Sequence, residues 1–432
     1  MLYLVKRRNG RLAAFCLLVV SFLPLDAFAQ ITESLLPTPL APPRAPQEQP
    51  SAFGPLGVPV GNFFWFPRAE LDEAYNSNVF ATSTGHTTGA LITALTSSFD
   101  LLSNFPRDSL NLHGGSLSQF YAGHSAQNTQ DGFASADGTL DVTGGSSLYG
   151  TAQVAHQHIS YGSPNSPGDI AEPVTYWAYN ADAGYYAGGR RFTYGVDFGV
   201  TAAQYNAAQL FGGGVLPQSS QNAIAYSAAV YGGYQIIPDY VGYIRIGGTL
   251  FDYLRIPVGQ ISPNFSTYRA DIGLQILPRH LISGDAYVGY LIQNFSQSSL
   301  GSNSTPDFGG DLTWTITPLT TLTFTGLMTF ATGTPGTSIP SAGNSYLSRV
   351  FTAGVSHQLL PNLQLGFTGT YINNSFQGIT RTDNVFVVSA GLRYQVNRNL
   401  YIGVDGYYTQ QNSTGGNPFT QDGVTLRAAT QF

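Results

Sequence analysis

Apolar and polar residues alternate along much of this chain. In residues 384–396, NVFVVSAGLRYQV, every second residue from Phe386 to Val396 is apolar, whereas those between them from Ser389 to Gln395 are polar or glycine. Residues 266–277 and 363–371 show the same period of two. Successive side chains of a strand point to opposite faces, so this pattern predicts β-strands with one apolar and one polar face.

Two kinds of break separate the predicted strands and take turns along the chain. The short breaks contain residues that favour tight turns, and they are 104–108, 187–191, 236–240, 276–280, 316–320, 359–363 and 396–400. The long breaks, such as 207–221 and 332–345, are rich in Gly, Ser, Asn and Thr. From Pro238 the short breaks recur about every 40 residues, which is an internal repeat of strand pairs.

Short turns at one end and longer loops at the other are typical of an antiparallel up-and-down transmembrane β-barrel. We predict an all-β fold of about 18 strands, with 16 as the alternative, over residues 61–432. The rival all-β fold is a soluble sandwich or solenoid, in which the apolar face packs on a second sheet. The polar face here carries Asp, Arg, Gln and Gly, which favours a water-filled interior.

The first 60 residues lack the alternation. Lys6, three arginines and an apolar stretch from Leu12 to Leu23 precede Ala27-Phe28-Ala29, which predicts a signal peptide over residues 1–29. An uncleaved anchor helix is the alternative, but the apolar stretch is short for a span of about 20 residues. Residues 30–60 hold eight prolines and are expected to form a proline-rich periplasmic linker.

Composition narrows the class further. The only cysteine and the only lysine lie in the predicted signal peptide, so the mature chain has neither disulfides nor thiolate metal sites. Removing the four bases and Asp26 of that segment from the net charge of −6 leaves −9. This acidic balance argues against a nucleic-acid partner. No apolar run of the mature chain is long enough for a membrane helix.

The last predicted strand carries the alternation to Phe432. A barrel must pair its last strand with its first, because an unpaired edge in lipid leaves backbone groups unsatisfied. We therefore expect Phe432 to lie at the periplasmic interface and to act as a membrane-insertion signal for the barrel-insertion machinery.

The strand parities place a set of charged side chains on the inner, lumen-lining face: Arg68, Glu70, Asp72, Asp182, Asp197, Arg245, Arg269, Asp271, Asp285, Asp311, Arg393, Asp405 and Arg427. An acid excess along a water-filled wall favours cations. The equally weighted alternative is that acids and arginines form cross-strand pairs that brace the wall. The glycine-rich segment 210–217 is flexible enough to fold into the lumen.

No catalytic motif is found. There is no Gly-x-Ser-x-Gly elbow, phosphate loop or His-Glu-x-x-His pattern, and adjacent Ser356 and His357 face opposite sides of a strand. His156 and His158 point the same way, but no third metal ligand lies near them in sequence. We predict no catalytic residue, cofactor or metal, and therefore a protein that is not an enzyme.

Residues 57–82, GVPVGNFFWFPRAELDEAYNSNVFAT, contain Gly61, Phe63 and Pro67 in a short strand, followed by Tyr75-x-x-Asn78 and Thr82. This pattern resembles a family of outer-membrane β-barrel porins of proteobacteria. The resemblance implies a barrel in the outer membrane, with some relatives linked to exopolysaccharide export. It implies no catalytic residue and no particular solute.

The function expected from these observations is a porin-like channel for passive passage of small hydrophilic solutes in the outer membrane of a Gram-negative bacterium. One alternative is the outer-membrane component of an exopolysaccharide secretion system, in which Tyr243, Tyr287 and Tyr407 stack on sugar rings. A second is an outer-membrane enzyme or a structural barrel. The expected partners are outer-membrane lipid, the insertion machinery and solutes or polysaccharide. A homo-oligomer stays open, because porin-like barrels are often trimers.

Overall fold

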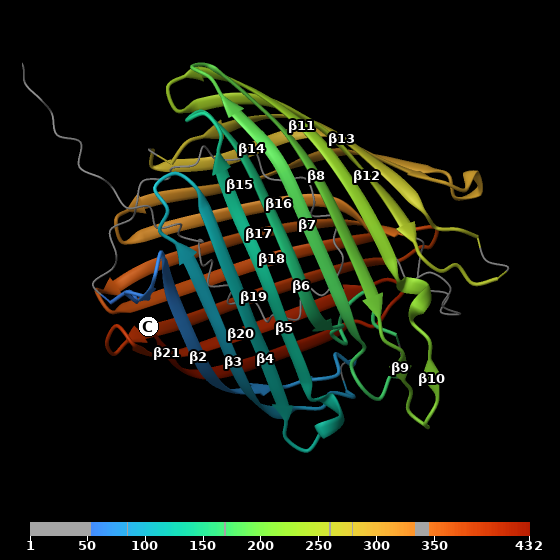
Figure 1. The fold of residues 1–432 in the computed structure, drawn as a ribbon. Helices are drawn as coiled ribbons and strands as arrows, with labels where there is room; N and C mark the ends of the chain where they lie inside the picture. The colour runs from blue at the N-terminus through green and yellow to red at the C-terminus, as the bar shows by residue number, and fades with distance from the viewer. Residues whose placement is uncertain (1–52, 84, 168–169, 259–260, 279, 333–344) are drawn as a thin grey trace, which may run out of the picture.

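The computed structural model describes residues 53–432 except 84, 168–169, 259–260, 279 and 333–344. The predicted signal peptide and most of the predicted linker lie outside the described residues, so these two predictions stay untested. Figure 1 shows the described chain as one barrel of long, tilted strands.

Among the described residues, eighteen long strands form the wall, and three shorter strands and three short 3₁₀ helices flank them. In chain order the elements are β1 (Val58–Val60), β2 (Phe63–Asn76), β3 (Ala90–Ser103), β4 (Ser109–Tyr121), η2 (Ser125–Gln127), β5 (Thr129–Asp141), β6 (Ser146–His158), β7 (Thr175–Gly188), β8 (Phe192–Tyr205), β9 (Ala208–Gln209), β10 (Val215–Leu216), η3 (Ser219–Gln221), β11 (Ala223–Ile237), β12 (Tyr240–Tyr253), β13 (Phe265–Ile276), β14 (Ile282–Phe295), η4 (Ser298–Leu300), β15 (Ser302–Thr317), β16 (Thr320–Thr332), β17 (Ser345–Leu360), β18 (Leu363–Gln377), β19 (Thr382–Gln395), β20 (Leu400–Ser413) and β21 (Phe419–Gln431). Within the described residues, no helix is long and apolar enough to cross a bilayer.

Each wall strand pairs antiparallel with its neighbours in sequence, and β2 pairs with β21 to close the ring. The closing register runs from Arg68 opposite Gln431 to Asn76 opposite Gly423, and the Phe432 N–H donates to the Pro67 carbonyl at 3.2 Å. The prediction of 18 strands is confirmed, and the alternative of 16 is wrong. The closed ring leaves no free sheet edge between the first and last wall strands.

The turns are short at one end of the barrel and the loops are longer at the other, as predicted. Residues 238–239, 318–319 and 361–362 connect neighbouring strands by two residues each. In the first of these turns Asp239 adopts a left-handed backbone (φ 69°), which an aspartate tolerates better than most residues. We call these two ends the short-turn end and the long-loop end.

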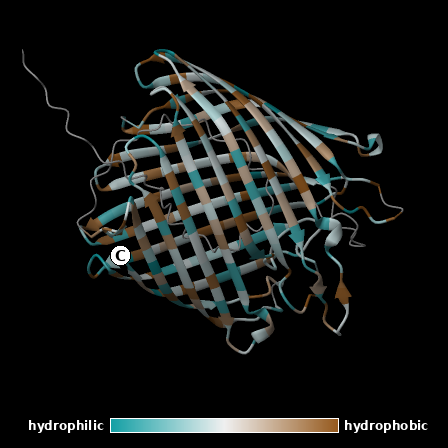
Figure 2. Ribbon diagram, in the orientation of Figure 1, coloured by the Kyte–Doolittle hydropathy of each residue, from teal (hydrophilic) through white to brown (hydrophobic). Residues whose placement is uncertain are grey.

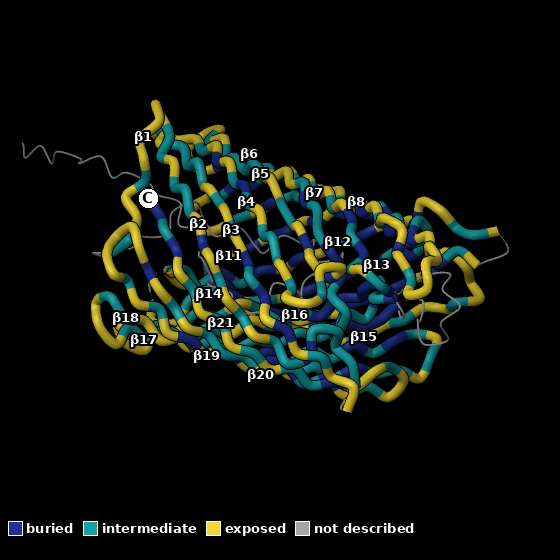
Figure 3. The backbone as a smooth tube through the Cα atoms, turned by 90° about the horizontal axis from the view of Figure 1, so that it is seen from below, coloured by how far each residue is buried: buried dark blue, intermediate teal, exposed yellow. Residues whose placement is uncertain are grey.

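Burial follows the alternation over most of the wall. Along β11, buried and exposed residues alternate from Ala223 to Tyr234. Figure 2 shows hydrophobic and hydrophilic bands interleaved along the strands, and Figure 3 shows the same interleaving for burial. The exposed members are mostly large apolar side chains, such as Phe198, Ile244 and Ile272. The outer face of the barrel is therefore apolar, which suits contact with lipid.

Asn78 holds the loop between β2 and β3 in place against β21. It is fully buried, and its amide group donates to the carbonyls of Thr82 (2.7 Å) and Thr420 (2.9 Å). Its side-chain oxygen accepts from the Thr82 N–H at 3.0 Å. Asn78 thus ties the loop after β2 to β21, beside the closing pair of strands.

Among the described wall strands, the fewest residues pair at the seam between β15 and β16. The two strands pair only from Gly310 opposite Gly326 to Thr317 opposite Thr320. Residues 302–309 of β15 pair with β14 alone, and residues 327–332 of β16 pair with β17 alone. Pro306 lacks an N–H, so one backbone position of this strand edge needs no neighbouring strand.

Beyond the seam, β16 and β17 fold inside the barrel. Met328, Phe330 and Leu347 are buried against Leu291 of β14, and Arg269 of β13 donates to the Met328 carbonyl. Leu291 and Arg269 lie on the inner face, opposite exposed residues such as Ile272 and Tyr290. The ends of β16 and β17 therefore form a second layer on the inner surface of β13 and β14.

Candidate functional site

The polar inner face is the candidate site. All of the charged residues predicted to line the lumen lie on wall strands, and their sequence neighbours Leu71, Phe198, Ile272 and Leu426 are exposed on the opposite face. The predicted residues are Arg68, Glu70 and Asp72 on β2, Asp182 on β7, Asp197 on β8, Arg245 on β12, Arg269 and Asp271 on β13, Asp285 on β14, Asp311 on β15, Arg393 on β19, Asp405 on β20 and Arg427 on β21. Their contribution to a conducting path stays a prediction.

One cluster bridges the strands that close the barrel. The Arg427 Nε lies 3.0 Å from Glu70 and 3.1 Å from Asp72, and its Nη1 lies 3.3 Å from Asp405. Glu70 also pairs with Arg68. A single guanidinium thus holds carboxylates from β2 and β20 together, which fixes the last strand against the first.

Tyr401 extends this closing cluster. Its hydroxyl donates to Glu70 at 2.6 Å, and the Arg393 guanidinium lies 3.7 Å from the centre of its ring. Tyr401 is almost fully buried. The two contacts combine a charge-assisted hydrogen bond with a cation–π interaction in a part of the wall that excludes water.

A second cluster lies on β12 to β15. Arg245 donates from two nitrogens to Asp271 at 2.7 and 3.0 Å, and the side chains are 6% and 0% exposed. Arg269 lies 2.9 Å from Asp307. The Tyr243 hydroxyl donates to Asp285 at 2.9 Å. These buried pairs support the bracing interpretation for Arg245, Arg269 and Asp271.

Other acids lack an arginine partner. In the described part of the chain no arginine lies within ion-pair distance of Asp182, Asp197 or Asp311. Asp182 accepts hydrogen bonds from Thr151 and Asn180. The inner face therefore combines neutralised pairs on some strands with uncompensated acids on β7, β8 and β15.

A histidine site was missed by the prediction. The ring nitrogens of His113 on β4 lie 2.5 Å from Asp100 and 2.8 Å from Asp137. Asp137 also accepts from Asn111 at 2.9 Å. His113 has the parity of the inner face, so strand alternation could have identified it. Asp307 was missed in the same way, although it shares the parity of Asp311.

The loop 159–174 crosses the long-loop end of the barrel. Asn165 donates to the Thr332 carbonyl of β16 at 3.1 Å. A Cβ at Gly162 would lie 2.7 Å from the Phe419 ring of β21, so the loop touches that strand as well. The loop starts and ends on β6 and β7, which lie across the ring from β16. It therefore narrows this mouth of the barrel.

The loop is held by packing and hydrogen bonds. Its residues Ile159, Ile170 and Val174 form a buried cluster with Tyr176. Tyr161 donates to Gln127, and burial raises the pKa of the Tyr161 hydroxyl to about 12, so it stays a donor at neutral pH. The Gln127 amide in turn donates to the Ala171 carbonyl at 2.8 Å.

The segment 210–217, which we expected to be able to fold inward, instead forms the tip of the hairpin of β9 and β10. Phe211 and Val215 are exposed there. Three glycines, 212 to 214, permit the tight turn, and two of them have positive φ. The loop that crosses the mouth is 159–174. Its contact with β16 joins residues too far apart in sequence for any local pattern to predict.

Residues considered for chemistry have ordinary partners. His156 lies 2.9 Å from the Gln130 carbonyl, and His158 lies 2.8 Å from Asp131. His357 contacts Thr320, whereas Ser356 accepts from Gln364. Over the described ranges, no group of three or more His, Cys, Asp or Glu side chains is arranged to hold a metal ion.

The chain is similar to known proteins over most of its length. A family model described as "Putative beta-barrel porin 2" matches residues 49–432. No curated protein matches the chain. Among solved structures, the chain is similar to the outer membrane protein opdK from Pseudomonas aeruginosa, with 11% identity, a TM-score of 0.43 and coverage of 85% of this chain and 99% of that one. It is also similar to the siderophore receptor PiuA from Acinetobacter baumannii, with 11% identity, a TM-score of 0.45 and coverage of 87% and 82%.

Proposed function

The chain belongs to the family described as "Putative beta-barrel porin 2", and from this premise we propose that small hydrophilic solutes diffuse passively through its lumen past the loop 159–174. The protein is an outer-membrane β-barrel of a Gram-negative bacterium and forms a channel for small solutes. The observation that carries the finer proposal is the closed ring with an apolar outer face and a charged inner face.

The mouth sets the size of the solute. An 18-stranded wall encloses an aqueous channel unless something fills it. Here loop 159–174 and the inner ends of β16 and β17 meet through Asn165 and Thr332. We therefore expect a narrow pathway that admits small solutes and excludes long or bulky ones.

The inner charge sets the preference among ions. Arginine pairs neutralise Asp271 and Asp307, whereas Asp182, Asp197 and Asp311 have no arginine at ion-pair distance within the described chain. An acid excess on a wet wall attracts cations and repels anions. We propose a weak cation preference.

No specific observation favours the two alternative functions. The tyrosines expected to stack on sugars for an exporter include Tyr243 and Tyr287, and both are buried within the wall. The histidines and serine considered for catalysis are engaged with neighbouring residues. The insertion role of Phe432 and the homo-oligomer stay predictions.

Single-channel recording of the refolded mature chain in planar bilayers tests the proposal. A matched variant replaces residues 159–174 by a short turn, which is feasible because His158 and Thr175 are cross-strand partners. We expect small, steady openings for the natural chain and conductance several-fold larger for the variant, because the loop no longer spans the mouth.

A control variant shortens residues 296–301, a loop at the same end that joins β14 and β15. Its conductance should match that of the natural chain. If folded, inserted barrels are electrically silent both with and without loop 159–174, the passive-channel proposal is wrong. A stable chloride preference in a salt gradient would contradict the cation preference alone.

A further inference from the structure

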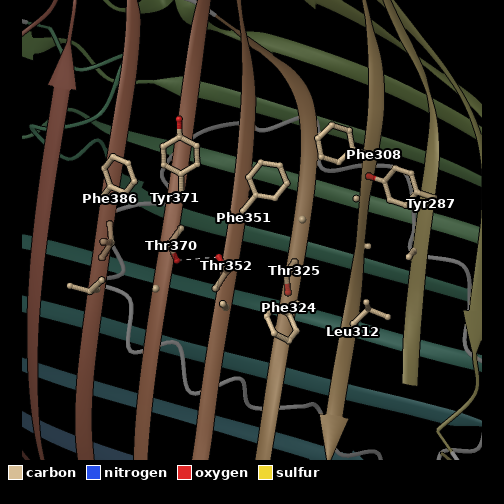
Figure 4. Close-up of a pocket in the computed structure, with 18 residues that line it drawn as sticks. Tyr287, Phe308, Leu312, Phe324, Thr325, Phe351, Thr352, Thr370, Tyr371 and Phe386 are labelled. Carbon is tan, nitrogen blue, oxygen red and sulfur yellow. Dashed lines mark hydrogen bonds between the residues drawn. The ribbon is translucent and has the colours of Figure 1, made fainter. Parts of the chain in front are cut away.

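The outer wall contains an apolar cavity of about 530 Å³ at the seam. It extends over β14 to β19 and includes the point where β15 and β16 separate. Figure 4 shows the residues that line it, with the ribbon of β16 bending away from β15 beyond Thr325. Its volume lies in the range of small-molecule sites, about 300–1,000 Å³.

Small residues make the floor of this cavity. Gly310, Gly326, Ala353 and Gly369 occupy outward positions on four consecutive strands, β15 to β18. Gly310 is opposite Gly326, and Ala353 is opposite Gly369. Many other outward positions hold large apolar side chains, so the small residues leave a groove across these strands.

Aromatic rings form the rim. Phe308 of β15 stacks on Phe351 of β17 with ring centres 5.9 Å apart, and the ring centres of Tyr371 and Phe386 are 4.8 Å apart. Phe308 and Phe351 meet across β16 because Gly326 has no side chain there. A Cβ at Gly326 would lie 3.2 Å from Phe351. Figure 4 shows these rings side by side along the groove.

One polar group lies at the inner end. Tyr287 of β14 is 8% exposed, and its hydroxyl has no hydrogen-bond partner among the described residues. The hydroxyl is close to Gly309, where a Cβ would lie 2.6 Å from it. Figure 4 shows this hydroxyl directed toward β15 at the seam. Tyr287 has the inner-face parity of Asp285 and Leu291, so its ring and hydroxyl close the inner end of the cavity.

From this arrangement we propose that the seam is a binding site for one acyl chain of a membrane phospholipid. The hydrocarbon lies along the groove of small residues between the aromatic rings. The site is independent of solute passage and requires only that the outer face lies in the bilayer.

Two observations favour a lipid over other occupants. The groove opens on the outer face, where Phe308, Phe324 and Phe386 are exposed, and this face contacts lipid in an outer-membrane barrel. The lining is almost wholly apolar, with hydroxyl groups as its only side-chain polar atoms. A peptide or sugar would bring many polar groups without partners.

Photolabelling with a phosphatidylethanolamine that carries a diazirine on one acyl chain tests the site. The full-length mature protein is reconstituted with this lipid, irradiated and mapped by mass spectrometry. Labelling should concentrate several-fold on peptides of β15 to β18 relative to the outer face of β11. Native mass spectrometry should detect one retained phospholipid for each barrel.

Gly369→Phe is the blocking variant, because the nearest atom to a Cβ there is a Val388 methyl at 4.0 Å. The matched control is Gly232→Phe on the outer face of β11, where no atom lies within 4 Å of the added Cβ. Gly369→Phe should lose the retained lipid and the concentrated labelling, whereas Gly232→Phe should keep both.

Circular dichroism verifies that each variant is folded, and single-channel conductance should not change with Gly369→Phe. Uniform labelling around the barrel, or lipid retention that survives Gly369→Phe, would overturn the site. Binding of a free diazirine fatty acid without any phospholipid retention would overturn the assignment of the occupant to a membrane lipid.

Discussion

The wall from β11 to β13 and the seam from β15 to β17 are built from strands of similar length but differ in burial. In β11 to β13 the pairing is continuous, and buried and exposed residues alternate. In β16 four consecutive residues from Met328 to Ala331 are buried, and in β17 the first four residues are buried. Strands of the regular wall are thus buried on one face only, whereas the ends of β16 and β17 at the seam are buried on both faces.

The difference shows that the alternation of buried and exposed residues depends on what each face of a strand contacts. A strand alternates where one face contacts lipid and the other faces the lumen. At the seam the ends of β16 and β17 lie inside β13 and β14, so both of their faces are covered by protein. Runs of consecutive buried residues then replace alternation, as in other strands that are covered on both sides.

The largest effect is expected in the regular wall, at the buried Arg245–Asp271 pair. Asp271→Ala leaves a guanidinium that is 6% exposed without its carboxylate. Loss of one partner of a buried pair costs about 3–5 kcal/mol. Urea unfolding of the reconstituted barrel should show this loss. Arg107→Ala, which removes an exposed partner of Asp141, is the control and should change little. Equal effects would contradict the role assigned to the wall pair.

A phenylalanine truncation compares the seam with the wall directly. Phe330 and Phe198 are 1% and 62% exposed, respectively. Phe330→Ala should cost about 3–5 kcal/mol because it leaves a cavity between two protein layers. Phe198→Ala should cost about 1.5–3 kcal/mol, because lipid fills the space and only the transfer energy is lost. Chemical unfolding in the same lipid measures both, and equal costs would argue against a dry inner layer.

Glycine substitutions should affect the two regions differently, because backbone atoms approach Gly309 closely at the seam but no atom approaches Gly232 in the regular wall. A Cβ at Gly309 would lie 2.4 Å from the Gly326 carbonyl oxygen, so Gly309→Ala must displace backbone at the seam. We expect a loss of about 1–3 kcal/mol. Gly232→Ala in the regular wall has open space and should leave stability unchanged or raise it by up to about 1 kcal/mol. Thermal melts of both variants provide the comparison.

The smallest expected effect is a change in ion selectivity when one inner-face carboxylate is neutralised. Asp197 lies on the inner face of β8 without an arginine at ion-pair distance in the described chain, unlike Asp307 near the seam, which is paired with Arg269. Asp197→Asn should lower the cation preference slightly, measured as a shift of reversal potential in a salt gradient. Asp252→Asn on the outer face is the control. A larger shift from the control would contradict the assignment of Asp197 to the lumen wall.

Much of the fold could be predicted because alternation and turn chemistry are local. The repeat that starts at Pro238 gave the strand number, and the parity around Arg245 and Asp271 placed them on one face. One short turn, residues 142–145, was missed although it contains two glycines. Its Gly144 has positive φ and was the available signal.

The seam and the mouth could not be predicted in the same way. Pro306 within a strand indicates an edge, and the run from Leu327 to Ala331 breaks alternation, so both were local signals of the seam. Neither shows that β16 folds inward, because that depends on Arg269 and Leu291 from other strands. The contact between Asn165 and Thr332 joins segments 167 residues apart and depends on the closed ring.

The inward fold of β16 and β17 makes the two openings of the barrel unequal. One opening is ringed by short turns, and the other contains the inner strand ends and loop 159–174. In the proposed channel, ions driven from opposite sides therefore enter through two different openings. Current through such an asymmetric duct should rectify, so reversing the applied voltage should change the magnitude of the current as well as its sign.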